Sequence, residues 1–208
     1  MLGILGQKAS MSQVFKEDGK CIPVTSIIAG PCYVVQIKEK DKEGYSAVQL
    51  GLLDKKEKRT TRALAGHFKK ANVTAKKFVR EMRIKGDEKV EIGQAIDLDM
   101  FKEGDFVDVS GMSIGKGFQG GMRRYGWSGG PRTHGGMNHR GPGSVGTNTT
   151  PGRILRGHGL PGHMGHRRTT VQSLEIIKVD KENNILMVKG AVPGHKGTYL
   201  EVRKAKKK

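Results

Sequence analysis

The sequence has 208 residues, enough for one large or two small domains. Hydrophobic residues make up only 35% and aromatic residues 5%, so the core must be small for this length, whereas the 31 glycines are about twice the usual share of roughly 7%. Lys and Arg number 38 against 20 acidic residues, and the formal charge of +18 predicts a polyanionic partner.

Two classes of protein are disfavoured by the same composition. No apolar run approaches the ~18 residues that a membrane span requires, and the first residues lack the basic start and long apolar stretch of a signal peptide. Cys21 and Cys32 cannot make a disulfide framework, and a chain with so few thiols fits a reducing compartment. We therefore expect a cytoplasmic protein, neither secreted nor held in a membrane.

Residues 1–110 contain compact apolar segments separated by turn-forming residues. The pattern predicts strands at residues 2–6, 22–29, 33–38, 47–53, 78–84 and 105–109, with turns at 17–20, 30–31 and 42–44. Residues 60–71 are predicted to form a short helix whose apolar face holds Ala63, Leu64, Phe68 and Ala71. Short strands at this spacing favour a small β-barrel over an alternating β-α-β fold.

Residues 111–170 differ in composition from the rest. They hold 18 glycines, four prolines and five of the seven histidines, with no helical or strand periodicity. Residues 109–174 carry nine Lys and Arg and no acid, whereas residues 1–108 carry 20 basic and 16 acidic residues. With so few aliphatic side chains this segment cannot build a core of its own, so we expect a long irregular extension. A flexible basic linker is the simplest alternative.

Strand patterns return after residue 170. Residues 171–180 and 185–190 flank a hairpin turn at 181–184, and residues 198–202 form a last strand before a basic tail at 204–208. The predicted architecture is mainly β, with one barrel domain built from residues 1–110 and 171–208. Residues 111–170 would be extruded from it as an arm.

Catalytic, cofactor and metal sites find little support in the arm. Residues 115–120 match the dinucleotide-binding pattern G-x-G-x-x-G, which needs a following helix and an acid about 20 residues later. The glycines that come next predict no helix, and the next acid is Glu175. The histidines could suggest zinc, but no Cys or carboxylate accompanies them, and no serine has an acid nearby to orient a histidine base. We expect no enzyme activity, no cofactor and no metal.

Arginine distinguishes the arm from a simple linker, because eight of the 13 arginines fall in it. A guanidinium forks onto phosphate and stacks on bases, and Phe118, Tyr125 and Trp127 lie among these arginines. Folded RNA offers a narrow, irregular, charged space better than duplex DNA does. The candidate RNA-binding residues are Lys116, Phe118, Arg123, Arg124, Trp127, Arg132, His134, His139, Arg140, Asn148, Arg153, Arg156, His158, His163, Arg167 and Arg168.

Several motifs together resemble the bacterial large-subunit ribosomal protein L-three family. They are GILGQKASMSQVF at residues 3–15, SIGKGFQG at 113–120, HRGPGSVG at 139–146, NTTPG at 148–152, GHMG at 162–165, RTTVQSL at 168–174 and LMVKGAVPG at 186–194. They follow one another over almost the whole chain, which is far more specific than any single motif.

The resemblance implies a six-stranded barrel like those of translation factors, with a small α+β insertion at about residues 55–100. It implies a non-catalytic protein that binds large-subunit rRNA early in assembly and extends its arm toward the peptidyl-transferase centre. Expected neighbours are proteins of the L-fourteen and L-nineteen families, with no small-molecule substrate and no homo-oligomer. The turn nearest the catalytic RNA would consist of Ser144, Val145, Gly146, Thr147, Asn148 and Thr149.

Two features of this turn concern Asn148 and its surroundings. Asn148 could brace RNA with its amide, or it could merely tolerate a left-handed backbone before Pro151. Many bacterial members of the family carry an N-methylated glutamine near this position. Here no glutamine lies between Gln119 and Gln172, so this modification is not expected.

Two other classes of function compete with the ribosomal interpretation. A free-standing nucleic-acid chaperone or DNA-architectural protein would not co-sediment with large subunits at moderate salt. A nicotinamide- or metal-dependent enzyme would be purified with its cofactor or zinc.

Overall fold

A computed structural model describes residues 3–84 and 90–207 of the chain. Leu2 and Lys208, at the ends of a predicted strand and of the basic tail, lie outside these residues. The chain forms two compact units, called here unit 1 (Met1–Ser113 with Arg168–Lys208) and unit 2 (Ile114–Arg167). The arm expected at residues 111–170 corresponds to unit 2 except for three residues at each end, which lie in unit 1.

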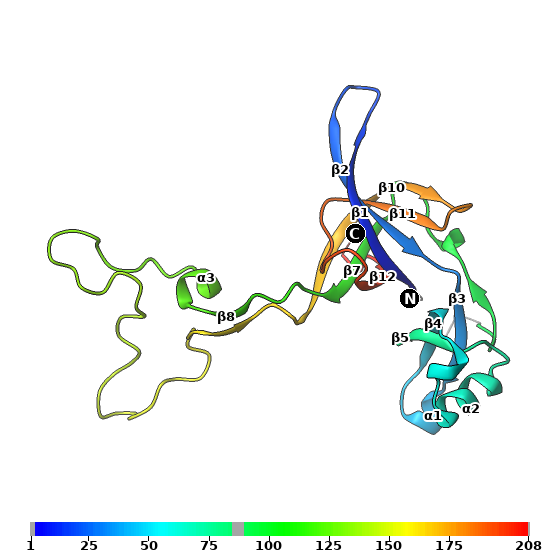
Figure 1. The fold of residues 1–208 in the computed structure, drawn as a ribbon, viewed down its shortest axis with the longest axis horizontal. Coiled ribbons are helices and arrows are strands. Elements are labelled where there is room, and N and C mark those ends of the chain that lie inside the picture. The colour runs from blue at the N-terminus through cyan, green and yellow to red at the C-terminus, as the bar shows by residue number, and fades with distance from the viewer. Residues whose placement is uncertain (1–2, 85–89, 208) are drawn as a thin grey trace. The chain divides into compact units, whose positions relative to one another are not determined.

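Unit 1 is built on a closed antiparallel barrel of six strands in the order β1-β12-β7-β10-β11-β2 (Figure 1). The strands are β1 (Gly3–Phe15), β2 (Cys21–Ala29), β7 (Phe106–Met112), β10 (Arg168–Asp180), β11 (Ile185–Lys189) and β12 (Tyr199–Lys204). Alternate side chains point inward, and Ile4, Ile27, Val109, Leu186 and Leu200 are completely buried. The predicted mainly β class and the six-stranded barrel are confirmed.

The hairpin of β1 and β2 is longer than expected. We predicted a strand at residues 2–6, but β1 continues to Phe15 and pairs with β2 as far as Cys21. The distal half of this hairpin is mostly exposed, so its residues lack the apolar alternation that marks a half-buried strand. The expected turn at 17–20 closes it, with the Lys16 amide donating to the Lys20 carbonyl at 3.0 Å.

A second antiparallel sheet has the order β5-β4-β3-β6. It consists of β3 (Cys32–Lys38), β4 (Ala47–Asp54), β5 (Lys76–Arg83) and the short β6 (Ala95–Ile96). The predicted strands at 33–38, 47–53 and 78–84 therefore belong to this sheet and not to the barrel, and the α+β part begins at Cys32 instead of near residue 55. Gly30, with φ of 91°, and Pro31, which lacks an N–H, separate β2 from β3.

The barrel and the second sheet share one hydrophobic core. Ile4 and Leu5 of the barrel belong to the same buried cluster as Val34, Leu50 and Met82 of the sheet. The α+β part is thus packed onto the barrel by apolar burial.

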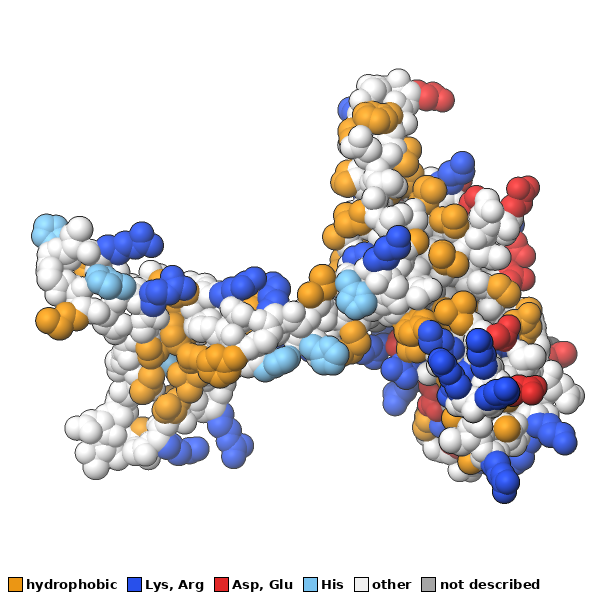
Figure 2. All heavy atoms as spheres, viewed as in Figure 1, with side chains coloured by type: hydrophobic (Ala, Val, Ile, Leu, Met, Phe, Trp, Pro, Cys, Tyr) orange, Lys and Arg blue, Asp and Glu red, His pale blue; other side chains and the backbone are white. Residues whose placement is uncertain are grey.

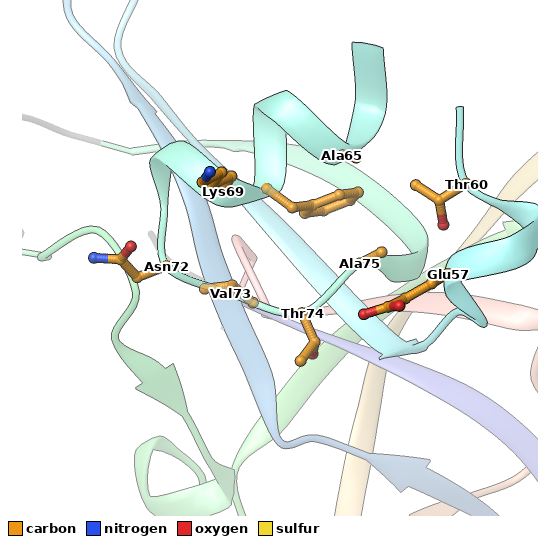
Figure 3. A pocket seen from close by; sticks show the side chains of 9 residues that line it. Glu57, Thr60, Ala65, Lys69, Asn72, Val73, Thr74 and Ala75 are labelled. Atoms are coloured by element: carbon orange, nitrogen blue, oxygen red, sulfur yellow. The ribbon is translucent and has the colours of Figure 1, made fainter. Parts of the chain in front are cut away.

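Short helices connect these strands: α1 (Lys40–Glu43), the 3₁₀ turns η1 (Glu57–Arg59) and η2 (Leu98–Met100), and α2 (Arg62–Lys70). Of the face predicted for residues 60–71, only Phe68 and Ala71 are buried, while Leu64 is 42% exposed. The helix therefore packs through its C-terminal end, against Val35. A groove of about 560 Å³ remains between α2 and residues 72–75 (Figure 3).

In the described part of the chain, no helix is both long and apolar enough to cross a membrane.

Candidate nucleic-acid interface

Unit 2 follows β7 and precedes β10, two paired barrel strands in which Met112 lies opposite Arg168. It begins and ends with a small ribbon formed by β8 (Gly117–Gln119) and β9 (Gly162–Met164). Phe118 lies directly opposite His163, so both rings point to the same side of the ribbon. Phe118 is 76% exposed and His163 is also exposed. The ribbon thus presents two flat rings side by side on an open face.

A five-residue helix, α3 (Gly121–Tyr125), follows β8 and ends at Gly126 in the left-handed conformation, with φ of 71°. The expectation of no regular structure in this segment is therefore wrong at β8, β9 and α3. The ring of Trp127 lies directly against Gly121, where a Cβ would come within 2.2 Å of three ring atoms. Glycine is required at this position because Trp127 packs on the helix backbone, and this close packing lets a short glycine-flanked helix persist.

Arg124 ties α3 to the returning half of the unit. Its guanidinium donates to the carbonyl of Leu160 and lies 5.0 Å from the ring centroid of Tyr125. Tyr125 in turn packs against Gly159. These contacts connect residues near the start of unit 2 with residues near its end, so unit 2 holds a local shape despite its glycine content.

The loop that follows α3 is braced by main-chain contacts. The Gly130 amide donates to the His139 carbonyl at 3.2 Å, and Nδ1 of His139 lies 2.9 Å from the Pro131 carbonyl. A hollow of about 400 Å³ opens beside this crossing and is lined by Met122, Ser128, Gly130, Arg132, His139 and Arg140. Two guanidinium groups and one imidazole at a hollow of this size suit a phosphate or the edge of a base.

The turn at residues 144–149 is exposed along its entire length. It is shaped from within: Oγ of Ser144 donates to the Gly146 carbonyl at 3.2 Å, and Oγ1 of Thr147 donates to the Thr150 carbonyl at 2.6 Å. The backbone of Asn148 is not in the left-handed region. The interpretation of Asn148 as a residue that merely tolerates such a backbone therefore has no support. Its side-chain amide takes part in neither of these two hydrogen bonds.

The candidate RNA-binding side chains are exposed with two exceptions. Arg124 and Trp127 are half-buried because they pack within unit 2, so their first role is to hold its shape. Arg168 lies in β10 of unit 1, where it pairs with Glu201. The hollow beside α3 brings Arg132, His139 and Arg140 together, whereas the other candidates are distributed along the unit.

Unit 2 carries Lys116 and seven arginines and has no acidic residue. Figure 2 shows Lys and Arg side chains along it without an acidic side chain among them. Sequence reasoning missed the apolar side chains that accompany them: Met137 is 98% exposed and Leu155 is 65% exposed. Their signal in the sequence was the presence of large apolar residues in a segment with no apolar periodicity.

The surroundings of the G-x-G-x-x-G pattern differ from those of a dinucleotide site. Gly120 is followed by α3, which has one and a half turns, and β8 pairs with the antiparallel strand β9 instead of a parallel neighbour. Among residues 3–84 and 90–207, no three His, Cys, Asp or Glu side chains are grouped as metal ligands would be.

Comparison with known proteins gives a consistent result over the whole chain. A family model described as Ribosomal protein L3 matches residues 33–184. The large ribosomal subunit protein uL3 of Finegoldia magna is 50% identical over 205 residues, which cover 99% of this chain and 98% of that protein. The protein of the same name from Carboxydothermus hydrogenoformans is 48% identical, over 99% of this chain and 98% of that protein. The one from Brachyspira pilosicoli is 43% identical, over 100% of this chain and 95% of that protein. The resemblance of the sequence motifs is thus confirmed, and the chain belongs to the ribosomal protein L3 family.

Proposed function

We propose that the chain is a structural, non-catalytic protein of the large ribosomal subunit that binds large-subunit rRNA chiefly through unit 2. The relatives named above are large-subunit proteins. The observation that carries the proposal is the composition and exposure of Ile114–Arg167, a folded, acid-free unit whose basic side chains, apart from the half-buried Arg124, face solvent. Such a surface neutralises phosphates without repelling them.

Different parts of unit 2 suit different features of folded RNA. Arg132 and Arg140 line a hollow that can receive a phosphate. The exposed rings of Phe118 and His163 offer a stacking surface for unpaired bases. Glycine at positions such as Gly130, where a Cβ would come within 2.2 Å of the Asn138 carbonyl oxygen, keeps the unit narrow, since no Cβ stands between its backbone segments.

The finer elements of the proposal follow from the family. The protein would act in the cytoplasm, bind early in subunit assembly beside L-fourteen and L-nineteen family proteins, and place its turn at residues 144–149 close to the peptidyl-transferase centre. The exposed turn, which carries no acid and no histidine, supports a role in bracing RNA because general acid–base catalysis needs a titratable group in reach.

Sucrose-gradient fractionation tests the ribosomal role. We expect the chain to co-sediment with large subunits at moderate salt, and a variant that lacks unit 2 to shift toward the free fractions. If the intact chain stays in the free fractions while it still binds nucleic acid, a free-standing chaperone or DNA-architectural protein is the correct alternative.

Substitutions at Asn148 test the placement of the turn. Asn148→Asp adds a negative charge at nearly constant shape, and Asn148→Gly removes the amide. We expect both variants to alter sensitivity to antibiotics of the peptidyl-transferase centre, Asp more than Gly, while peptide-bond formation persists. Unchanged sensitivity in both variants would remove the support for this placement, and loss of peptidyl transfer in fully assembled subunits would contradict the non-catalytic role.

A further inference from the structure

Three arginines of unit 1 converge on a single carboxylate. Arg80 of β5, Arg168 of β10 and Arg203 of β12 line a hollow of about 410 Å³ together with Glu201 of β12. We call these four residues the arginine cluster. The Glu201 side chain is only 9% exposed, whereas those of Arg80 and Arg168 are 55% and 59% exposed. The carboxylate thus forms the floor of the hollow, and two guanidinium groups are open to solvent.

The cluster has more hydrogen-bond donors than the carboxylate can accept. Both Arg168 and Arg203 direct an Nη2 atom at Oε2 of Glu201, the latter at 3.3 Å, while Nε of Arg80 lies 3.8 Å from Oε1. Three guanidinium groups carry fifteen N–H donors in total, against two carboxylate oxygens. Nε of Arg203 is buried and has no hydrogen-bond partner among the described residues. A buried donor of this kind costs stability unless an acceptor reaches it.

The other acid at the hollow does not neutralise this excess. Glu81 is bound on its own side by Nζ of Lys38 at 2.7 Å and by the hydroxyl of Tyr45 at 2.8 Å, and these two donors hold the pKa of Glu81 below its usual range. The arginine cluster therefore keeps three positive charges against one negative charge, a net charge of about +2.

Arg80, one of the two exposed arginines of the cluster, is held in place before any ligand arrives. The guanidinium of Arg80 lies 4.7 Å from the ring centroid of Phe78, and Phe78 stacks on Tyr199 at 4.5 Å. A guanidinium that rests on an aromatic face loses less conformational freedom when it binds an anion. The geometry is therefore that of a prepared anion site, in which Glu201 orients the arginines without neutralising them.

We propose that the arginine cluster binds a phosphate group of the RNA backbone. Phosphate offers several oxygens to forked donors, which fits guanidinium groups that arrive from three strands. Arg168 also follows unit 2 immediately in the chain. An RNA strand bound at the last residues of unit 2 would therefore come next to Arg168. The site lies in unit 1 and goes beyond the proposed function, and it rests on that function only in assigning the phosphate to RNA.

Phosphate binding is tested on the full chain with inorganic phosphate as the probe, by following the arginine Nε–Hε signals in NMR spectra. We expect a saturable shift of the Arg203 signal, and Arg80→Gln to weaken phosphate binding by about tenfold. The matched control is Arg59→Gln, which removes the same charge from an exposed position on η1. Shifts that never saturate, or that are equal in both variants, would overturn the site.

Glu201→Gln separates an anion site from a purely structural ion cluster. Removal of the carboxylate raises the positive charge of the hollow, so we expect tighter phosphate binding even though the free energy of unfolding falls. A structural cluster predicts the same loss of stability with no gain in phosphate binding. Because Arg80 is largely exposed, Arg80→Gln keeps the proposal testable if the Glu201 variant fails to fold.

The assignment to RNA is tested by the salt dependence of binding to large-subunit rRNA. We expect Arg80→Gln to reduce the slope of log affinity against log salt by about 0.7–0.9, the value of one phosphate contact, and Arg59→Gln to leave it unchanged. An unchanged slope in Arg80→Gln, or displacement of phosphate by an acidic peptide more readily than by RNA, would refute RNA as the occupant. Failure of the full chain to bind rRNA while phosphate still saturates the site would instead count against the proposed function.

Discussion

Removal of unit 2 should leave the barrel folded. Met112 and Arg168 lie directly opposite each other, so replacement of residues 113–167 by Asn-Gly would join β7 to β10 through a two-residue hairpin turn. None of the buried hydrophobic side chains of the described chain lies in Ile114–Arg167, so the deletion removes no transfer free energy from the core. Shortening the connection by roughly five doublings favours folding by at most about 3 kcal/mol.

Urea unfolding of the hairpin-closed variant and the full chain measures this difference. We expect one cooperative transition in the variant, with a free energy of unfolding between that of the full chain and about 3 kcal/mol above it. The gain in the variant should fall short of this upper limit because the contacts within unit 2 already restrict the connection in the full chain. A variant that loses its cooperative transition, or is less stable than the full chain by more than about 2 kcal/mol, would show that unit 2 belongs to the folding core.

Three further substitutions or reactions check individual contacts. Gly121→Ala places a methyl group inside the Trp127 ring, so the fluorescence of this single tryptophan should shift to the red while the urea midpoint of the barrel stays unchanged. An unshifted spectrum would contradict the packing of Trp127 on Gly121. Burial raises the pKa of Cys32 to about 12, so iodoacetamide at pH 8 should modify only Cys21 in the folded chain and both thiols in denaturant, and two equivalents under native conditions would refute the burial. Phe68→Ala should lower the free energy of unfolding in urea by about 3 kcal/mol, and a loss below about 1 kcal/mol would show that α2 is not anchored by this ring.

The sequence was most informative where burial imposes a strict period. Strands such as β4 and β11 were predicted within a residue because their apolar residues face a core. The distal hairpin of β1 and the short ribbon of β8 and β9 were missed because main-chain pairing alone defines them. Which strands share a sheet was also beyond the pattern: Val34 and Leu50 read as barrel positions, yet they pack from a second sheet onto the same core.

For the candidate interface, the sequence identified the segment but not how its side chains are arranged in space. The absence of acids and the wealth of arginine identified the segment, but nothing local indicated that Arg124 binds a carbonyl 36 residues away. The alternative for Asn148, a left-handed backbone, could be rejected only from the backbone angles of the structure. The arginine cluster of unit 1 was not visible at all, because Arg80 and Arg203 are far apart in the chain and lie in two different sheets, so they meet only where the second sheet packs on the barrel.

The central claim, that unit 2 binds RNA by neutralising phosphates, is tested most directly by the salt dependence of binding to large-subunit rRNA. The full chain should show a slope of log affinity against log salt of magnitude about 4–8, from about 0.7–0.9 per phosphate contact. In the hairpin-closed variant, which loses eight basic residues, the slope should fall by at least half. A slope near zero for the full chain, or equal slopes for the two proteins, would contradict the account.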